Sequence, residues 1–396
     1  MKAFDDLESR GLVKQTTNVD KVRALLNGNK SQTFYIGFDP TADSLHVGHL
    51  LQIITAKRLA DAGHKPIMLI GGATALIGDP TGKSEMRKML SRSDIRVHAE
   101  AIAAQIKKIM GQEIWMVNNL GWFENENFLT LLRNIGQYFS INNMLRAECF
   151  KSRMEHGLSF LEFNYMIMQA EDFRVLNASE DCILQIGGDD QWSNILAGID
   201  LIHKKEGREV FGLTLPLLVN SDGTKMGKTE KGAVWLDPNK TSPFEFFQFW
   251  RNIPDDKVKQ CINFFTDEAN SEASILLNIN QHKKFLAFEV TKLVHGEDEA
   301  QRALEHAEAL FEKRNTSAME TISITEGTHI LDLVIKCNFA KSRTDARNLI
   351  TNRGITINGE VQDNPTINIS KSIFGNELVV KKGKKHFCRI LIEDTW

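Results

Sequence analysis

The sequence predicts an α/β protein with an open, parallel sheet, and two observations support this fold. Short apolar runs, each ending in Gly, Asn or Asp, alternate with amphipathic segments over residues 1–220. This alternation is typical of a parallel sheet covered by helices. In such sheets ligands bind outside the carboxyl ends of the strands. The segments of this chain that are rich in Gly, His and Asp also follow the expected strands. The expected strands are TFYIGF, PIMLIGG, EIWMVNN and CILQIGG, and the clearest expected helices are residues 50–62 and 98–110.

The pattern changes after residue 220, and a chain of 396 residues is expected to hold more than one domain. Residues 221–243 are rich in Gly, Lys and Thr and predict a long loop and linker. Residues 244–320 are predominantly helical, and the polar segment 316–328 is expected to be a linker. Residues 328–396 predict a small α+β unit, with two helices in ILDLVIKCNFAKSRTDARNLITNRG and strands in ITINGE, INIS, LVVKKGKK and FCRILIE.

The composition is that of a soluble globular protein, with 42% hydrophobic and 25% charged residues. No apolar run approaches the ~20 residues that a membrane span needs. The first residues, MKAFDDLESRG, are acidic and polar and resemble neither a signal peptide nor a transit peptide. The five cysteines are scattered and form no C-x-x-C pair, which indicates free thiols in a reducing cytosol. We therefore expect a cytoplasmic protein that has neither a membrane span nor a structural zinc site.

The net charge of −3 hides an asymmetry along the chain. Residues 330–396 contain 11 Lys or Arg against 7 Asp or Glu, a local charge of +4, which leaves −7 for the rest. A basic tail on an acidic body predicts an appended domain with a polyanionic partner. On charge alone, a solvated surface is an equally good explanation.

Two histidines, His46 and His49, flank Gly48 after a turn-rich segment. Ser44 is expected to cap the helix that follows, which places both histidines in its first turn and on one face. Exposed N–H groups at a helix N-terminus attract phosphate, and imidazoles there can donate further hydrogen bonds. Gly48 leaves room for a flat adenine against the backbone. Two ordinary surface histidines are the alternative for this motif alone, whereas zinc is disfavoured because no third ligand lies nearby.

Two lysines, Lys225 and Lys228, lie three apart in the Gly-containing segment KMGKT. Such lysines can bind a polyphosphate as mobile point charges, although the loop alone would indicate a solvated run of charge. H-x-G-H near the first strand and K-M-x-K followed by Ser or Thr after the last form the paired signature of class I aminoacyl-tRNA synthetases. By contrast, GDPTGKS at residues 78–84 is not a P-loop, because its first two glycines lie one residue too close together.

Longer segments make the resemblance closer. In order, and along essentially its whole length, the chain is similar to bacterial-type tyrosyl-tRNA synthetases, class I enzymes with a C-terminal S4 domain. The resemblance implies a Rossmann-like catalytic domain in residues 1–220, a KMSKS-type loop and linker in 221–243, an α-helical anticodon-binding domain in 244–320 and an S4-like RNA-binding domain in 328–396. The segments that support it are YIGFDPTADSLHVGH (35–49), GGAT (71–74), IGDP (77–80), LQIGGDDQW (184–192), WLDP (235–238) and TSP (241–243).

The resemblance also implies a tyrosine pocket. An ammonium is bound well by an ionised carboxylate with neutral acceptors, and a buried phenol needs partners of its own. Phenylalanine would leave those partners unpaired and so be excluded without an editing domain. Tyr165 and Gln169 lie four residues apart, with Asp172 one turn beyond, so one helical face can present all three. The implied roles are Tyr35 and Asp172 on the phenolic hydroxyl, Asp79, Tyr165 and Gln169 on the α-ammonium, and Gln185 lining the site.

The remaining site residues are implied to bind ATP. Because the tyrosine carboxylate is already ionised at neutral pH, catalysis is expected to come mainly from positioning and charge stabilisation. ATP is expected as a substrate with Mg²⁺, and no dedicated metal site is expected in the protein. The groups implied to act on the phosphates are Thr41, His46, His49, Lys83, Arg87, Lys225 and Lys228. Those implied for the rest of the ATP site are Gly37, Asp39, Gly48, Gly188, Asp190 and Gln191.

The family reaction forms tyrosyl-adenylate and pyrophosphate, then transfers tyrosine to the 3′ end of tRNA(Tyr). The resemblance further implies a homodimer with residues 128–145 at its interface. This chain departs from the usual family pattern at Glu171, where Tyr is common, at Leu120-Gly121, where Tyr-Asp is common, and at Asp189, where many relatives have Ser. Glu171 is expected to face away from the pocket, about 100° round the helix from Asp172.

Three alternatives remain open at this stage. A paralogue could activate a tyrosine-like amino acid for biosynthesis, but the S4-like tail disfavours it. The related tryptophan enzyme lacks such a tail and the pair formed by Tyr35 and Asp172. An RNA-binding protein built on an inactive synthetase is disfavoured because the histidines and lysines of both motifs are intact.

Overall fold

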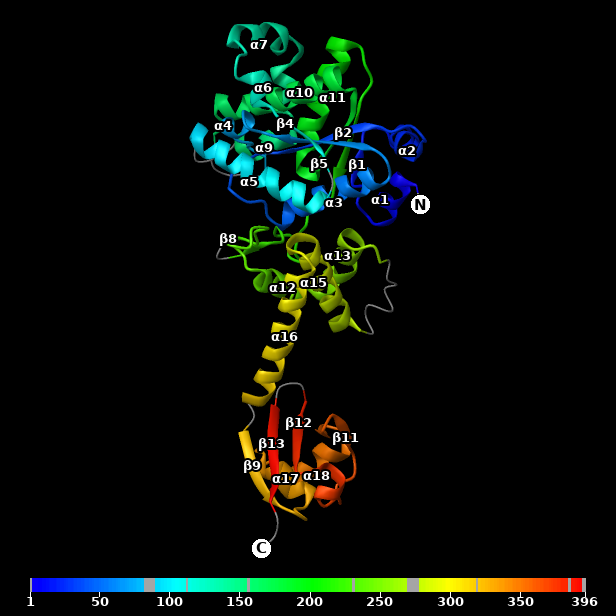
Figure 1. The fold of residues 1–396 in the computed structure, drawn as a ribbon, viewed down its shortest axis with the longest axis vertical. Helices are drawn as coiled ribbons and strands as arrows, with labels where there is room; N and C mark the ends of the chain where they lie inside the picture. Colours follow the sequence, from blue (N-terminus) through cyan, green and yellow to red (C-terminus); the bar gives the residue numbers. More distant parts are fainter. Residues whose placement is uncertain are drawn as a thin grey trace. The chain divides into compact units, whose positions relative to one another are not determined.

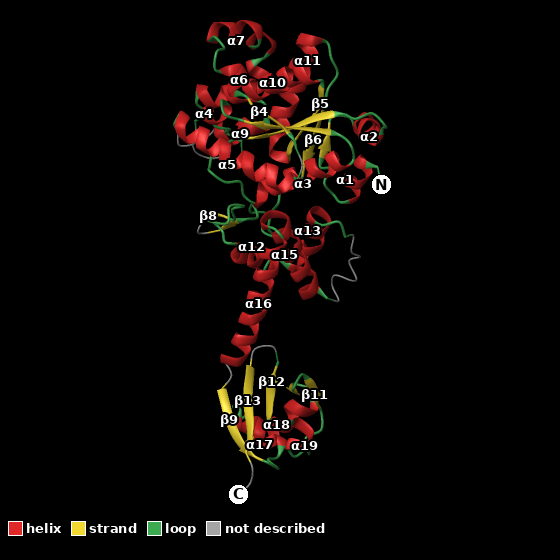
Figure 2. Cartoon of the chain, in the orientation of Figure 1, coloured by secondary structure: helices red, strands yellow, loops and turns green. Residues whose placement is uncertain are grey.

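The computed structural model describes residues 2–81, 90–111, 113–154, 157–229, 232–268, 278–317, 320–383 and 386–393. The chain divides into two compact units, residues 1–304 and 305–396. Figure 1 shows the elements coloured along the sequence, and Figure 2 shows helices, strands and loops in the same view. Within the described part of the chain, no helix is long and apolar enough to span a bilayer.

A sheet of six described strands forms the centre of the first unit, in the order β1-β6-β5-β2-β3-β4. Strands β2 to β6 are parallel to their neighbours, and the short β1 runs antiparallel to β6. This arrangement confirms the predicted parallel α/β sheet. At its centre, Tyr35 on β2 pairs with Ile67 on one side and Gln185 on the other. The strands are β1 (Gln15–Thr16), β2 (Thr33–Phe38), β3 (Lys65–Ile70), β4 (Trp115–Asn118), β5 (Cys182–Gly188) and β6 (Phe211–Leu215).

Helices cover both faces of this sheet, and Figure 2 shows α3 and α5 on one side with α10 and α11 on the other. α3 packs against β3 and α5, whereas α10 and α11 pack against each other and against β5. The two helices expected from the sequence are α3 and α5. The helices are α1 (Ala3–Ser9), α2 (Val19–Asn27), α3 (Val47–Asp61), α4 (Thr74–Ile77), α5 (Arg92–Met110), α6 (Leu120–Phe123), α7 (Phe128–Asn134), α8 (Ile141–Leu145), α9 (Glu148–Met154), α10 (Phe160–Glu180) and α11 (Trp192–Glu206).

One strand differs from its predicted environment. The run EIWMVNN was expected to be a buried strand, but β4 lies at the edge of the sheet and Trp115 is 57% exposed. An apolar run of this length does not reveal whether a strand will be central or at an edge, because either position accepts it.

The long helix α10 has ends that are fixed by its own sequence. The Ser159 side chain accepts a hydrogen bond from the Glu162 backbone N–H at 3.2 Å, and the Glu162 carboxylate accepts one from the Ser159 N–H at 3.2 Å. This reciprocal capping satisfies N–H groups that the first turn leaves without intrahelical acceptors. The helix ends at Asp181, which has a left-handed backbone with φ of 50°. The three polar residues predicted to share one helical face therefore lie on one continuous helix.

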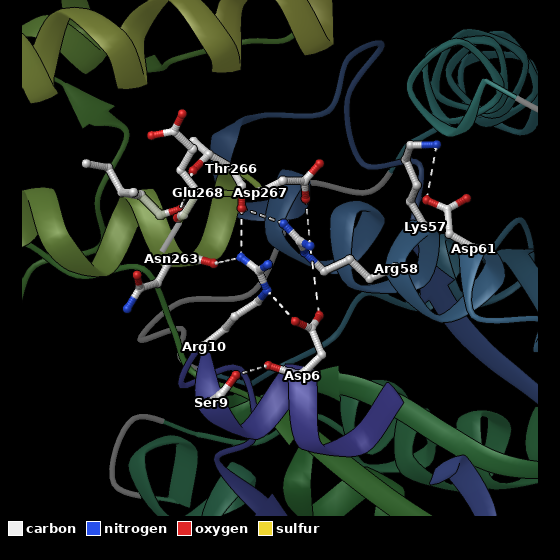
Figure 3. A network of polar contacts seen from close by, with 11 residues as sticks. Asp6, Ser9, Arg10, Lys57, Arg58, Asp61, Asn263, Thr266, Asp267 and Glu268 are labelled. Carbon is white, nitrogen blue, oxygen red and sulfur yellow. Dashed lines mark hydrogen bonds and ion pairs between the residues drawn. The ribbon is translucent and has the colours of Figure 1, made fainter. Parts of the chain in front are cut away.

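Three described helices after the sheet belong to the same unit as the sheet: α12 (Pro243–Arg251), α13 (Val258–Phe265) and α15 (Ile279–His295). A polar network joins the end of α13 to α1 and α3 (Figure 3). Arg10 donates to the carbonyl oxygens of Asn263 at 3.0 Å and Thr266 at 2.7 Å, and Arg58 donates to that of Thr266 at 2.7 Å. These carbonyls lie at the C-terminal end of α13, the negative end of the helix dipole. The next helix, α16 (Glu297–Ser317), contains the boundary between the two units, after Leu304.

Carboxylates complete this network. Asp6 accepts from Arg10 at 2.9 Å, and Asp267 accepts from Arg58 at 2.9 Å. The Arg58 side chain is only 14% exposed, and burial, assisted by the neighbouring Arg10 charge, lowers its pKa. Two guanidinium groups, Arg10 at the end of α1 and Arg58 on α3, thus hold the end of α13.

The second unit contains a sheet of five described strands in the order β11-β10-β12-β13-β9. The two predicted helices are present as α17 and α18, with the short α19 later in the chain. Residues such as Ile330, Leu333, Ile390 and Ile350 form its buried core. The elements are β9 (Glu320–Thr325), α17 (Ile330–Lys336), α18 (Arg343–Thr351), β10 (Ile355–Ile357), β11 (Glu360–Gln362), α19 (Lys371–Phe374), β12 (Glu377–Lys382) and β13 (His386–Glu393).

Three predictions for this unit were wrong. The expected linker 316–328 contains β9, which pairs in parallel with β13 and alternates Ile322 and Ile324 toward the core. The segment ITINGE is a hairpin rather than one strand, because Asn358 and Gly359 both have positive φ, at 51° and 88°. INIS is not a described strand, and its Asn368 forms a single isolated bridge with His329.

Candidate active site

A cavity of about 300 Å³ opens at the carboxyl ends of the central strands. Its walls come from β2, the start of α3, the middle of α10, the end of β5 and the loop after β6. Lys83 and Arg87 lie outside the described residues, and so does the side chain of Lys228, whose backbone is in β7 (Lys228–Thr229). The other residues predicted for the site all line this one cavity: Tyr35, Gly37, Asp39, Thr41, His46, Gly48, His49, Asp79, Tyr165, Gln169, Asp172, Gln185, Gly188, Asp190, Gln191 and Lys225.

The two histidines form the start of α3. The predicted cap was wrong, because His46 rather than Ser44 occupies the N-cap position, and the Ser44 hydroxyl donates to the Leu45 carbonyl oxygen instead. His46 Nδ1 accepts from the Gly48 N–H at 3.1 Å, and His49 Nδ1 accepts from the His46 N–H at 3.2 Å. A ring nitrogen that accepts carries no proton, so each neutral imidazole holds its proton on Nε2. The rings stack with centroids 4.0 Å apart.

Gly48 is required by the position of the His46 ring. A Cβ atom at residue 48 would lie 2.8 Å from Cε1 and 3.0 Å from Nδ1 of His46. Contacts this short force the ring to move. Gly48 therefore allows the His46 ring to lie against the first turn of α3 and cap the helix. This role is separate from any space that the glycine leaves for adenine.

The lysine-containing loop packs directly on this helix start. Gly227 has φ of +83°, and a Cβ atom there would lie 2.1 Å from Val47 Cγ2. Its carbonyl oxygen accepts from the Val234 N–H at 2.7 Å, and the Val234 carbonyl accepts from the Val47 N–H at 3.1 Å. Lys225 Nζ lies 3.0 Å from Asp190 Oδ2. The two sequence motifs, which lie far apart in the chain, thus share one wall of the cavity.

The Asp172 carboxylate lies deep in the cavity and is 2% exposed. Its two oxygens accept from Asn119 Nδ2 at 3.2 Å and from Trp122 Nε1 at 2.9 Å. Burial raises the pKa of Asp172 well above its usual range, and the two hydrogen bonds act in the opposite direction. Glu171, the departure before it, instead pairs with Arg174 at 2.7 Å, and it does not line the cavity.

Sequence reasoning assigned no role to three residues that hold these carboxylates. Asn119 and Trp122 bind Asp172, and Thr74 donates to Asp39 Oδ1 at 2.7 Å. The sequence does indicate a site role for Asn119, because a polar residue directly after an apolar strand lies at the edge of a parallel sheet where ligands bind. Trp122 carried no such signal.

Asp39 and Asp79 form the polar middle of the cavity. Tyr165 donates its hydroxyl to Asp39 Oδ2 at 2.8 Å, and burial, followed by the Asp39 charge, raises the pKa of Tyr165. Asp79 accepts from the Thr81 N–H at 2.9 Å and from Gln191 Nε2 at 2.8 Å. Each carboxylate is therefore held by neutral donors from separate elements.

Several buried oxygens in the cavity have no hydrogen-bond partner among the described residues. They are the Tyr35 hydroxyl, Thr81 Oγ1, Gln169 Oε1 and Gln185 Oε1. Burial raises the pKa of Tyr35 well above its usual range, with a smaller contribution from Asp172, so the phenol stays neutral. These atoms suit a ligand that carries several hydrogen-bonding groups. In the described part of the chain, no group of three or more His, Cys, Asp or Glu side chains is placed to hold a metal ion.

Comparison with known proteins identifies the family of this chain. Residues 27–312 match the family described as tRNA synthetases class I (W and Y). Residues 311–390 match the family described as tyrosine–tRNA ligase SYY-like C-terminal domain. The chain belongs to the tyrosine–tRNA ligases. The class I resemblance inferred from the paired motifs is thereby confirmed.

Individual relatives of this ligase agree with the assignment. A tyrosine–tRNA ligase of Clostridium kluyveri is 50% identical over 403 residues, covering 98% of this chain and 99% of the relative. One from Clostridium botulinum strain Hall is 48% identical over 404 residues, with 98% and 99% covered. A C-terminally truncated mitochondrial tyrosyl-tRNA synthetase of Aspergillus nidulans superposes with a TM-score of 0.70 at 32% identity, covering 78% of this chain and 94% of that one.

We expect Gly48→Ala to lower the rate of tyrosine-dependent ATP–pyrophosphate exchange by roughly 10²-fold. The added Cβ atom would displace the His46 ring, and a catalytic group that is misplaced by about 1 Å loses activity on this scale. Tyrosine binding, measured by equilibrium dialysis, should change little. Gly121→Ala is the matched control, since a Cβ atom there would meet nothing within 4 Å. A Gly48→Ala enzyme that exchanges pyrophosphate at the normal rate would show that the ring position is unimportant.

Proposed function

We propose that the cavity binds tyrosine and ATP together, forms tyrosyl-adenylate, and passes the tyrosine to the 3′ end of tRNA(Tyr). The main support is the set of buried oxygens on Tyr35, Gln169 and Gln185 that lack partners among the described residues. A buried polar group left unpaired costs on the order of 1–3 kcal/mol, so a ligand that pairs with all of them is favoured. Tyrosine offers a hydroxyl at one end and an ammonium at the other.

The phenolic hydroxyl of the substrate would bind between Tyr35 and Asp172. Asp172 is already oriented by Asn119 and Trp122, so little rearrangement is needed when the substrate enters. Phenylalanine in the same place would leave the buried Tyr35 hydroxyl unpaired and would offer Asp172 no hydroxyl to bind, which is the physical basis for its exclusion.

The α-ammonium would bind to acceptors at the middle of the cavity. Asp79 supplies a carboxylate that is 8% exposed, and Gln169 supplies a carbonyl oxygen from α10. Tyr165 contributes its hydroxyl oxygen, whose proton is donated to Asp39. Gln185 lines the same wall. A carboxylate with two neutral acceptors is the set that an ammonium group prefers.

ATP would bind along the edge formed by the two motifs. Thr41 lies in the loop after β2, and His46 and His49 lie at the start of α3, where the Nε2–H groups of the two imidazoles can meet phosphate oxygens. Lys225 would leave Asp190 for the phosphates, joined by Lys228, Lys83 and Arg87. The rest of the nucleotide would be bound by other residues that line the same cavity, namely Gly37, Asp39, Gly48, Gly188, Asp190 and Gln191.

In the first step the tyrosine carboxylate attacks the α-phosphorus of ATP. A bond forms between the carboxylate oxygen and that phosphorus, and the bond to the bridging oxygen breaks, which releases pyrophosphate. No general base is needed because the nucleophile is already ionised. The histidines and lysines would stabilise the charge that grows on the phosphates. Magnesium would enter with the nucleotide as part of the substrate.

The second step needs tRNA, for which we propose two further regions. The helices within residues 244–317 would form the anticodon-binding domain, and residues 320–396, which include β9, an S4-like RNA-binding domain with a local charge of +4 over residues 330–396. Part of that charge is paired within the unit, since Arg343 binds Asp332 and Arg353 binds Asp363. The exposed cations Lys341 and Arg347 are better placed to meet a phosphate backbone.

We also propose a homodimer whose interface includes residues 128–145. Exposed apolar side chains cluster in the sequence of α7 to α10: Phe128, Leu129, Leu132, Ile141, Met154 and Phe160. Leu129 is 73% exposed, although a short helix of a monomeric protein normally buries its leucines. Apolar groups of this kind indicate a protein interface, and a second copy satisfies the symmetry that most oligomers adopt.

A cytoplasmic location is the last part of the proposal. The five cysteines are free and buried. Burial raises the pKa of Cys149 and Cys261 to about 12, so these thiols stay protonated and unreactive. Thiols of this kind suit a reducing cytosol. Recovery of the protein mainly from a membrane or secreted fraction would contradict the proposal.

Tyr35→Phe should reduce the preference for tyrosine over phenylalanine, because it removes one partner of the substrate hydroxyl. Asp172→Ala should reduce it further, since it also leaves Asn119 and Trp122 without their acceptor. Competition between the two amino acids in ATP–pyrophosphate exchange measures both effects. Discrimination that stays unchanged in both variants would rule out this placement of tyrosine.

Leu129→Glu should convert a dimer into a monomer at concentrations where the unchanged protein sediments as a dimer, because it places a charge in an apolar interface. Val97→Glu is the control, since Val97 is also exposed, at 55%, but lies on α5 outside the proposed interface. Analytical ultracentrifugation distinguishes the two. Equal dimer content in both variants would place the interface elsewhere.

A chain that ends at Ser317 should form tyrosyl-adenylate at nearly the full-length rate while charging tRNA far more slowly. The cut must precede β9, because a cut at Thr328 would leave that strand without its partner β13 and invite aggregation. Full-length protein should also lose tRNA affinity more steeply with salt than the truncated chain, since phosphate contacts release counterions. Equal charging rates and equal salt slopes would show that the tail does not bind tRNA.

A further inference from the structure

Asp189 lies in the sequence between Gly188 and Asp190, two residues proposed to bind ATP, but its side chain does not line the cavity. Gly188 and Asp190 on either side of it line the cavity, as does Gln191, whereas Asp189 does not. These residues form the end of β5 and a short 3₁₀ turn, η2 (Asp189–Gln191). The Asp189 carboxylate is directed to the other side of this turn, where it meets the edge of the sheet.

Two donors converge on one oxygen of this carboxylate. Asp189 Oδ1 accepts from Gln15 Nε2 at 2.6 Å and from Thr214 Oγ1 at 2.8 Å. Thr214 is fully buried on β6, so its hydroxyl has no access to water. The Gln15 backbone N–H in turn donates to Thr214 Oγ1 at 3.1 Å. Gln15, Thr214 and Asp189 therefore close a ring of three hydrogen bonds that joins β1, β6 and η2.

The turn held by this ring presents two side chains to the active site. Asp190 Oδ2 lies 3.0 Å from Lys225 Nζ, and Gln191 Nε2 donates to Asp79 Oδ2 at 2.8 Å. A change in the turn would shift both contacts at once. The space for such a shift is small, since a Cβ atom on Gly188 would lie 2.9 Å from Asp190 Oδ1.

We infer that Asp189 is a positioning residue for ATP binding. Through Gln15 and Thr214 it fixes the turn η2, which carries Asp190 and Gln191, to the strands β1 and β6. This inference rests on the proposed roles of Asp190 and Gln191 in ATP binding. Because both hydrogen bonds end on Oδ1, the residue acts as an acceptor rather than as a charge. An asparagine carbonyl oxygen in the same place can accept both bonds, whereas alanine can accept neither.

The variants Asp189→Ala and Thr214→Val should each raise the KM for ATP in pyrophosphate exchange about tenfold, the effect of losing a buried hydrogen bond. Their kcat should stay nearly unchanged, and the KM for tyrosine should rise less than that for ATP. Asp189→Asn should restore the ATP KM to near the unchanged value. The double variant Asp189→Ala with Thr214→Val should cost less than the product of the single effects, because both remove the same bond.

A control separates this role from general loss of stability. Thr55 is a fully buried threonine whose hydroxyl donates within α3, so Thr55→Val removes a comparable group away from the turn. It should lower thermal stability about as much as Thr214→Val without raising the ATP KM. An ATP KM that rises equally in Thr55→Val and Thr214→Val would overturn the inference, as would an Asp189→Asn enzyme as impaired as Asp189→Ala.

Failure of the inference can be told apart from failure of the proposed ATP site. If Asp190→Ala and Gln191→Ala raise the ATP KM while Asp189→Ala does not, the edge binds ATP but Asp189 does not position it. If Asp190→Ala and Gln191→Ala also leave the ATP KM unchanged, the proposed site itself is wrong and the inference falls with it.

Discussion

The architecture of the active site depends on the close packing of Gly227 against Val47. No side chain fits at residue 227, where a Cβ atom would overlap the valine at 2.1 Å, and the positive φ there further favours glycine. Through this contact and the hydrogen bonds at Val234, the loop after the sheet becomes one wall of the cavity. Without these contacts, the lysines of the KMGKT segment would lie on a solvent-exposed loop. That is also what the segment indicates when it is read alone.

Much of the site was predictable from the sequence because parallel strands bring their carboxyl ends to one edge. Residues after β2 and β5, and those at the start of α3, meet there whatever the details of packing. The face of α10 followed from helical spacing alone. Trp122 could not be found this way, because its role depends on where a short helix places one indole N–H beside Asp172. Ser44 was given the wrong role because an imidazole nitrogen at the next available position caps the helix instead.

The wrong predictions for β9 and β4 have a similar cause, because both depend on contacts between distant parts of the chain. Residues 316–328 are mostly polar, and the two alternating residues Ile322 and Ile324 are too few to predict a strand; pairing with β13 makes that segment one. Trp115 is apolar but exposed because the sheet ends at β4. The fold class and the order of the main elements are thus encoded locally, whereas edges, pairing partners and hydrogen-bond donors to buried carboxylates are fixed by distant parts of the chain.

The contact between Arg10, Arg58 and the end of α13 has a consequence for how the first unit can be divided. Guanidinium groups from α1 and α3 have their acceptors in Asn263, Thr266 and Asp267, so a chain cut before α12 would retain two partly buried cations without them. Neither piece could then keep its native surface. The sheet and the helix α13 are therefore expected to unfold together.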